Sequence, residues 1–241
     1  MEHSNTPHLA ATPHGMISEP LQNIFFVTGT REWHFNDLDW QFSRNMTVVR
    51  DGDQLTLFNA VRLSDDGLKD LEKLGQIANV VQVGGLHGSD DAFYRDVYGA
   101  SYWAQPGAGQ DGVPVDRELT EGGELPVSGA ELFTFKTTSV PECIFRLERD
   151  GGVLIACDAL QNYLKPDEFF SEQSAQVMTD MGFFTPANVG PVWMQAAQPE
   201  AEDFRRLSEL SFQHVFCGHG APVLEGASEA YGATFKRLFD I

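Results

Sequence analysis

The chain has 241 residues, enough for one α/β domain or a pair of fused half-domains with a substantial buried core. Its 16 lysines and arginines stand against 35 aspartates and glutamates, so the net charge is −19. That charge disfavours nucleic acid and anionic membrane surfaces as partners, unless a bound metal offsets it locally.

No run of about 18 apolar residues occurs, and the N-terminus lacks the basic and apolar segments of a signal peptide. We therefore expect a cytoplasmic protein. The three cysteines, Cys143, Cys157 and Cys217, lie in apolar strand-like runs without CxxC spacing, which predicts reduced core residues. No sequence feature defines an oligomeric state.

The N-terminal residues 1–20 mix Pro, His, Ser, Thr and Ala without periodicity. This composition predicts a flexible tail ahead of one domain over residues 21–241. We expect the tail to contribute neither to the core nor to a functional site.

The first structured part of the chain is rich in predicted strands. Apolar runs at 46–50 and 55–63 flank an Asp-Gly turn at 51–52, which predicts a β-hairpin. Ser64 then precedes a helical pattern of leucines that Gly75 is placed to end, so we expect a capped helix between them.

A candidate functional loop follows the next apolar strand, residues 80–83. Gly84 and Gly85 let the backbone bend after the strand, and His87, Asp90 and Asp91 come within the next six positions. We expect a short helix from Asp90 onward, with its acidic residues in the first turn, and then a strand at 100–104.

The second half repeats this order loosely after a Gly- and Pro-rich connection at 106–128. We expect strands at 131–136, 142–148, 153–157 and 214–217, and helices at 200–211 and 226–239. The aromatic-rich segment 167–197 reads as helical or irregular, and its aromatic side chains belong either to the core or to a pocket wall.

Three apolar strands therefore end in side chains that can bind a metal. Residues 80–83 lead to His87, Asp90 and Asp91; residues 153–157 lead to Asp158; and residues 215–217 lead to His219. Asp158 and His219 stand alone at their strand ends and belong to no run of charges.

This order resembles the metallo-β-lactamase superfamily, an αββα sandwich whose loops place His and Asp ligands at one sheet edge. The family's His-x-His-x-Asp-His motif is similar in position to residues 84–93. Its Gly-Asp segment after an apolar strand resembles Cys157-Asp158, and its late Gly-His-Gly resembles residues 218–220. The resemblance covers residues 24–239 and implies an α/β fold of this αββα type.

The chain also departs from the family pattern. It has one histidine, His87, where the family has two, and no histidine occurs at 136–142, where the family's middle histidine falls. Five candidate ligands are too few for two ions that each need three or four. The resemblance thus implies a branch with a reduced metal-binding motif and one divalent ion. Its predicted ligands are His87, Asp91, Asp158 and His219, with Asp90 as a further ligand or as the catalytic base.

The favoured function is a metal-dependent hydrolase acting on a small molecule that no motif identifies. Such an ion lowers the pKa of a bound water from about 15.7 towards roughly 7, and Asp90 would orient the water or take its proton. Two histidines with carboxylates suit zinc or iron, and also manganese.

Two alternatives remain open. The chain is a metal-free binding or scaffold protein if His87, Asp90 and Asp91 only form a hydrogen-bonded cap at a helix N-terminus. It is a non-haem iron oxidoreductase if two histidines and a carboxylate hold an open iron site.

Overall fold

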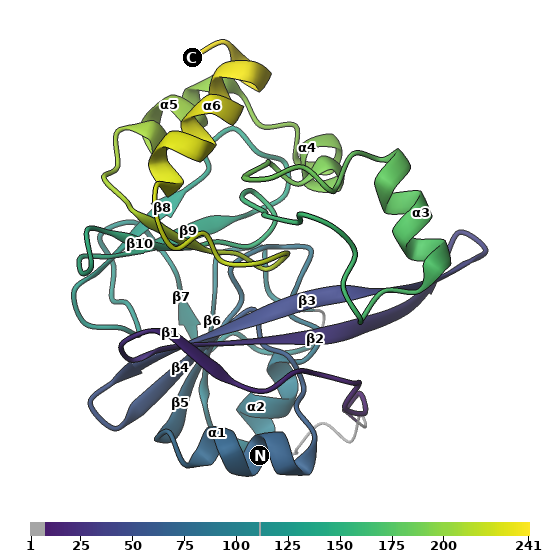
Figure 1. The fold of residues 1–241 in the computed structure, drawn as a ribbon. Helices are drawn as coiled ribbons and strands as arrows, with labels where there is room; N and C mark the ends of the chain where they lie inside the picture. Colours follow the sequence, from purple (N-terminus) through teal and green to yellow (C-terminus); the bar gives the residue numbers. More distant parts are fainter. Residues whose placement is uncertain (1–7, 111) are drawn as a thin grey trace.

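The computed structural model describes residues 8–110 and 112–241, and residues 1–7 and 111 lie outside this description. Two β-sheets pack face to face, and helices cover both outer faces (Figure 1). The predicted α/β architecture, an αββα sandwich, is confirmed. In the described part of the chain, no helix is long and apolar enough to cross a membrane.

The larger sheet has seven strands in sequential order. They are β1 (Ser18–Leu21), β2 (Ile24–Phe35), β3 (Leu38–Asp51), β4 (Gln54–Phe58), β5 (Gln76–Val81), β6 (Ser101–Ala104) and β7 (Arg117–Glu118). Strands β1 to β4 pair antiparallel, whereas β4 to β7 pair parallel. The carboxyl ends of the parallel strands therefore share one edge of the sheet.

The smaller sheet has four strands in the order β11-β10-β9-β8. They are β8 (Ala130–Thr134), β9 (Cys143–Leu147), β10 (Val153–Ile155) and β11 (His214–Phe216). Because β10 and β11 are parallel neighbours, the loops that follow them leave the sheet side by side.

Helices α1 (Asp65–Glu72) and α2 (Asp91–Tyr98) cover the outer face of the larger sheet, and α5 (Ala201–Ser208) and α6 (Ala227–Phe239) cover the smaller one (Figure 1). Helices α3 (Glu172–Asp180) and α4 (Pro191–Ala197) lie in the segment left open between helical and irregular structure. Ser64 caps α1 as predicted, since its hydroxyl accepts a hydrogen bond from the Gly67 N–H.

Strands β2 and β3 extend well beyond the sheet as a two-stranded hairpin, which the sequence analysis did not anticipate (Figure 1). The hairpin turns at Asn36 and Asp37, which have φ values of 50° and 57°. Such left-handed pairs form type I′ turns and favour Asn and Asp, so the dipeptide Asn36-Asp37 in the sequence indicates a hairpin turn.

Part of the predicted flexible tail is ordered against β2. Ser18 pairs with Phe26 within β1 and β2, and the Thr12 hydroxyl donates to the Thr30 carbonyl at 2.7 Å. The His14 ring lies 2.9 Å from the Ser64 hydroxyl. The cause is the edge of β2, whose unpaired backbone groups need partners that the preceding segment supplies. The first seven residues of the predicted tail lie outside the described residues.

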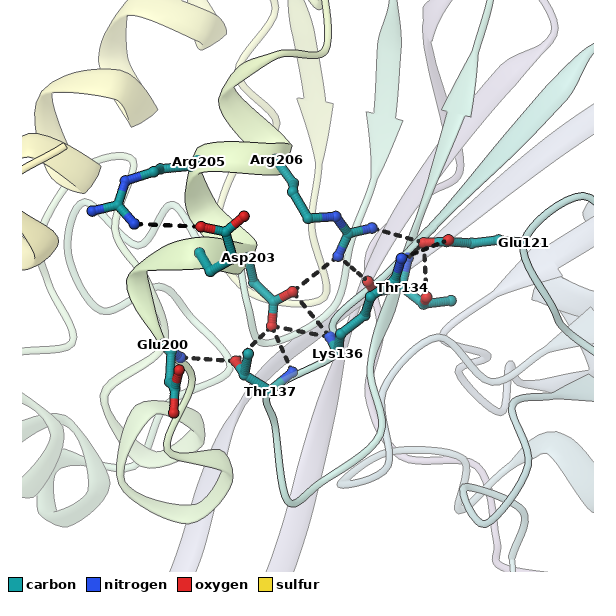
Figure 2. Close-up of polar contacts among 9 residues, drawn as sticks. Glu121, Thr134, Lys136, Thr137, Glu200, Asp203, Arg205 and Arg206 are labelled. Atoms are coloured by element: carbon teal, nitrogen blue, oxygen red, sulfur yellow. Dashed lines mark hydrogen bonds and ion pairs between the residues drawn. The ribbon is translucent and has the colours of Figure 1, made fainter.

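A buried carboxylate on α5 fixes the connection between β8 and β9 (Figure 2). Asp203 accepts hydrogen bonds from the backbone N–H groups of Lys136 and Thr137 at 2.9 to 3.0 Å and from the Thr137 hydroxyl at 2.6 Å. Arg206 pairs with Asp203 at 3.0 Å and also with Glu121 at 3.0 Å. These contacts hold the segment that leads into Glu142 and the candidate site.

Candidate metal centre

The loops after β5, β10 and β11 bring three of the predicted ligands into contact. His87 Nε2 lies 3.0 Å from His219 Nε2, and His219 Nε2 lies 3.1 Å from Asp158 Oδ1. His87 Nε2 lies 3.4 Å from Asp158 Oδ2. These side chains are 8 to 13% exposed, so the cluster is nearly buried but still reaches the surface.

His219 is held in the orientation of a metal ligand. The Tyr163 hydroxyl donates to the Ser43 carbonyl, and the Nδ1 of His219 lies 3.1 Å from that hydroxyl oxygen and 3.3 Å from that carbonyl. Both oxygens can accept from Nδ1–H, so we assign the proton to Nδ1 and the free lone pair to Nε2. A histidine whose other ring nitrogen donates to a fixed oxygen is the usual arrangement in metal sites.

The glycine after His219, Gly220, is required by close packing. A Cβ on Gly220, whose φ is 82°, would lie 2.1 Å from the Asn162 carbonyl carbon. The Asn45 side chain further fixes this loop by donating to the Cys217 and Gly220 carbonyls at 3.1 and 2.6 Å.

His87 is positioned through its backbone. Its carbonyl accepts hydrogen bonds from the side-chain amides of Gln82 and Gln110, both at 2.8 Å. Gly88 follows with a φ of 106°, and a Cβ there would lie 2.8 Å from the Gln82 side chain. The turn after β5 therefore has one conformation that sends the imidazole towards Asp158.

Asp158 is supported by Glu142, a fully buried residue that the sequence analysis did not select. Glu142 Oε1 accepts a hydrogen bond from the Ala159 N–H at 2.5 Å, and its Oε2 has no partner among the described residues. Burial, followed by the charge of Asp158, raises the pKa of Glu142. No sequence pattern identified Glu142, because one acidic residue before an apolar strand usually faces solvent.

The protonation states in the cluster suit a cation. Burial lowers the pKa of His87, although Asp158 acts in the opposite direction, so the imidazole is neutral at pH 7. Burial raises the pKa of Asp158, but the contacts with His87 and His219 outweigh it and hold that pKa well below the usual range. The cluster thus offers a neutral imidazole and a carboxylate, the forms that bind metals.

Asp90 lies outside this cluster. Its carboxylate forms an ion pair with Arg44 and accepts the Arg62 N–H at 2.6 Å. The Arg44 and Asp90 side chains are 8% and 2% exposed, so each neutralises a charge that would otherwise be buried alone.

Asp91 makes no contact of this kind. Within the described residues neither carboxylate oxygen has a hydrogen-bond partner, and no ion pair joins it to His87, Asp158 or His219. Burial and then Asp90 raise the pKa of Asp91 to about 7. The roles predicted for Asp90 and Asp91 remain predictions.

Comparison with known proteins identifies the fold of the chain. No protein-family model matches the chain, and a search of curated proteins finds no match. The DIM-1 metallo-β-lactamase exposed to ceftazidime matches 95% of this chain and 99% of its own, with a TM-score of 0.61 and 15% identity. FIM-1 from Pseudomonas aeruginosa, in its mono-zinc form, matches 94% and 96% with a TM-score of 0.59 and 14% identity. A metallo-β-lactamase from Hirschia baltica matches 93% and 98% with a TM-score of 0.58 and 15% identity.

The chain therefore has the metallo-β-lactamase fold over nearly its whole length, and the resemblance seen in the sequence is confirmed at this level. Within that fold it brings two histidines and one aspartate together where three strands end.

Proposed function

We propose that this protein is a metal-dependent hydrolase with one divalent ion held by His87, Asp158 and His219. The observation that carries the proposal is the spacing of their donor atoms, 3.0 to 3.4 Å. Donors about 2.0 to 2.1 Å from a tetrahedral zinc ion lie about 3.3 Å from one another. Small adjustments of these side chains would therefore admit an ion. The mono-zinc form of FIM-1 is a precedent for one ion in this fold.

Each of the three residues would contribute differently to binding the ion. Asp158 supplies a negative charge, and His219 supplies an Nε2 lone pair fixed by the contacts of its Nδ1. His87 supplies a neutral imidazole because burial lowers its pKa. Once bound, the ion would act as a Lewis acid at the scissile bond of the substrate.

Asp90 has a positioning role in this proposal. Its pairing with Arg44, and the contact of Arg44 with the Ser89 hydroxyl at 3.2 Å, tie the loop that carries His87 to β3. Action as a catalytic base would require Asp90 to separate from Arg44.

The β2–β3 hairpin suggests an apolar substrate. Cross-strand pairing of Trp33 with Trp40 places them on one face, and that face also carries Phe35 and Phe42. The Phe42 ring lies 6.1 Å from the His219 ring, and Trp33 and Phe35 are 45% and 47% exposed. An exposed aromatic face beside a metal site fits a small molecule with an apolar group.

A metal-free binding protein is the second candidate function. The observation that favours it is that Asp158 already contacts both histidines, so the cluster has internal partners without an ion. Asp158 would then contribute to stability rather than to metal affinity.

Metal analysis of protein purified without added metal separates these candidates. We expect about one equivalent of zinc in the wild type, and loss of at least tenfold in metal affinity in Asp158→Ala and His219→Ala. The exposed pair His34 and Asp39, 2.7 Å apart, provides the matched controls His34→Ala and Asp39→Ala, which should keep the metal.

Two results would redirect the proposal. A wild-type protein that binds no divalent ion, together with Asp158→Ala that loses only stability, would support the metal-free binding protein. Iron in place of zinc would favour the oxidoreductase, because two histidines and one carboxylate form a common iron site.

A further inference from the structure

The β2–β3 hairpin is covered unequally along its two edges. Beside β3, helix α3 fills the outer edge (Figure 1): the Gln41 N–H donates to the Ser174 hydroxyl at 2.8 Å, and the Gln41 carbonyl accepts from the Ser171 N–H at 3.0 Å. The outer edge of β2 is paired as far as Thr30, whose N–H donates to the Pro13 carbonyl at 2.9 Å. The hairpin continues past this point for several residues.

Two residues of β2 beyond Thr30 direct their backbone groups outward. In an antiparallel pair, alternate residues turn their N–H and C=O groups away from the partner strand. Because Thr30 does so, Glu32 and His34 do so as well. Among the described residues, no hydrogen-bond partner is found for the backbone groups of Glu32 or His34. An exposed strand edge of this kind is a template for pairing with another strand.

We propose that this edge pairs with the same edge of a second copy of the chain, in an antiparallel arrangement about a two-fold axis at Trp33. Glu32 of each copy then lies opposite His34 of the other copy and exchanges both backbone hydrogen bonds with it. This register uses the outward groups between Thr30 and the turn at Asn36. The inference is independent of the proposed function, because the contact involves none of the proposed metal ligands.

Charge complementarity favours a second copy as the occupant and also favours this register. Opposite charges that face each other across two strands stabilise the pair, and like charges destabilise it. In the proposed register the Glu32 carboxylate faces a histidine. An axis at Glu32 would set this carboxylate against its own copy and place His34 opposite Thr30, whose N–H and carbonyl already have partners. An axis at His34 would set two histidines against each other and place Glu32 opposite Asn36, which has a φ of 50° in the turn.

The aromatic side chains of the hairpin would be stabilised by the same contact. Trp33 and Phe35 are 45% and 47% exposed, and their rings stack with centroids 4.7 Å apart. The two copies of Trp33 would form a non-hydrogen-bonded pair, in which side chains approach most closely, and aromatic pairs across strands are stabilising. A two-stranded ribbon is marginally stable alone, so a four-stranded sheet formed from two hairpins would stabilise both.

Charge reversal tests the register. We expect the wild type to form a dimer as its concentration rises from low micromolar to several hundred micromolar, in sedimentation velocity experiments on metal-free and metal-loaded protein. Glu32→Lys sets a lysine against His34, and His34→Glu sets two glutamates against each other, so each variant should weaken the dimer by about tenfold. An equal mixture of the two variants should form a heterodimer, because both cross-strand pairs then join opposite charges.

Glu118→Lys is the matched control. It makes the same change in net charge as Glu32→Lys, at an exposed position of β7, an edge strand of the same sheet, and should leave the dimer unchanged. Equal effects of Glu32→Lys and Glu118→Lys would overturn the proposal. So would a mixture of Glu32→Lys and His34→Glu that forms no heterodimer.

Amide hydrogen exchange provides a second measurement that requires no variant. The N–H groups of Glu32 and His34 should exchange more slowly as the wild-type concentration rises, whereas that of Asp37 in the turn should not change. A dimer without this protection would use another surface and would overturn the assignment. A wild type that stays monomeric at every concentration would also overturn it, and Glu32 and His34 would then be charges that protect the edge from pairing.

Discussion

The loop after β5 has the strongest sequence pattern for a metal site, and the loops after β10 and β11 have much weaker ones. The contributions of these loops to the observed cluster do not follow that order. The first holds Asp90 and Asp91 beside His87 and was the strongest local pattern. The other two each hold a single candidate, Asp158 and His219. The isolated residues meet in one cluster with His87, whereas Asp90 pairs with Arg44, and Asp91 has no hydrogen-bond partner among the described residues.

The difference has a physical cause. Arg44 is nearly buried on β3 and requires an opposite charge, which Asp90 provides. A carboxylate in an acidic cluster can therefore neutralise a buried cation as well as bind a metal. Asp158 and His219 follow short apolar strands, where an ionisable side chain at a sheet edge has fewer local partners.

The largest expected effect on stability comes from breaking the Arg44–Asp90 pair. Asp90→Ala leaves a buried guanidinium without its counter-charge, and we expect a loss of about 3 to 5 kcal/mol in the free energy of unfolding. Urea denaturation measures the loss. The exposed Lys69–Asp66 pair is the control, and Asp66→Ala should cost far less.

A second variant sharpens this prediction. Arg44→Met in the Asp90→Ala background removes the orphaned charge and should recover part of the lost stability. If Asp90→Ala lowered the free energy of unfolding as little as Asp66→Ala, Asp90 would not be the partner of Arg44. That result would favour its predicted role as the catalytic base.

Asp91 should make the stability of the metal-free protein depend on pH. Its pKa of about 7 in the folded state lies above the ordinary value of 3.8. Its favourable contribution is therefore fully present below about pH 4 and is lost as the pH rises through 7, by at most about 4 kcal/mol. Asp91→Asn removes this dependence, so its stability relative to the wild type should increase between pH 4 and 8.

The control for Asp91 is Asp65→Asn, because Asp65 holds the same first position in α1 but is exposed. Thermal unfolding of the metal-free proteins at several pH values provides the measurement. A constant stability difference between Asp91→Asn and the wild type across this range would contradict a raised pKa for Asp91.

The smallest effect concerns the N-terminal segment. Deleting residues 1–21 removes β1 and several hydrogen bonds to β2, such as that from the Thr12 hydroxyl to Thr30, and at the lower end of about 0.5 to 1.5 kcal/mol per bond we expect a loss of about 3 kcal/mol. Deleting residues 1–7 provides the comparison. Metal content should not change in either truncation, because the hydrogen bonds and ion pairs of the cluster found among the described residues involve no residue before β2. An unchanged melting temperature after the longer deletion would support a tail that contributes nothing to the core.

The elements themselves could largely be predicted from the sequence. The Asp-Gly hairpin and the Ser64 cap follow from local rules of turn chemistry and capping. The apolar strands predicted at 80–83, 153–157 and 215–217 correspond to β5, β10 and β11 with shifted ends, because hydrophobic pattern locates a strand better than its boundaries. The β2–β3 extension was missed because its aromatic residues were read without the Asn36-Asp37 turn signal.

The sequence by itself determined the order of strands and loops, and with it the edge where His87, Asp158 and His219 gather. Only the tertiary structure decided how each polar side chain is used, because that depends on neighbours distant in sequence. Arg44 reaches Asp90 across 46 positions, and Glu142 reaches Ala159 across 17.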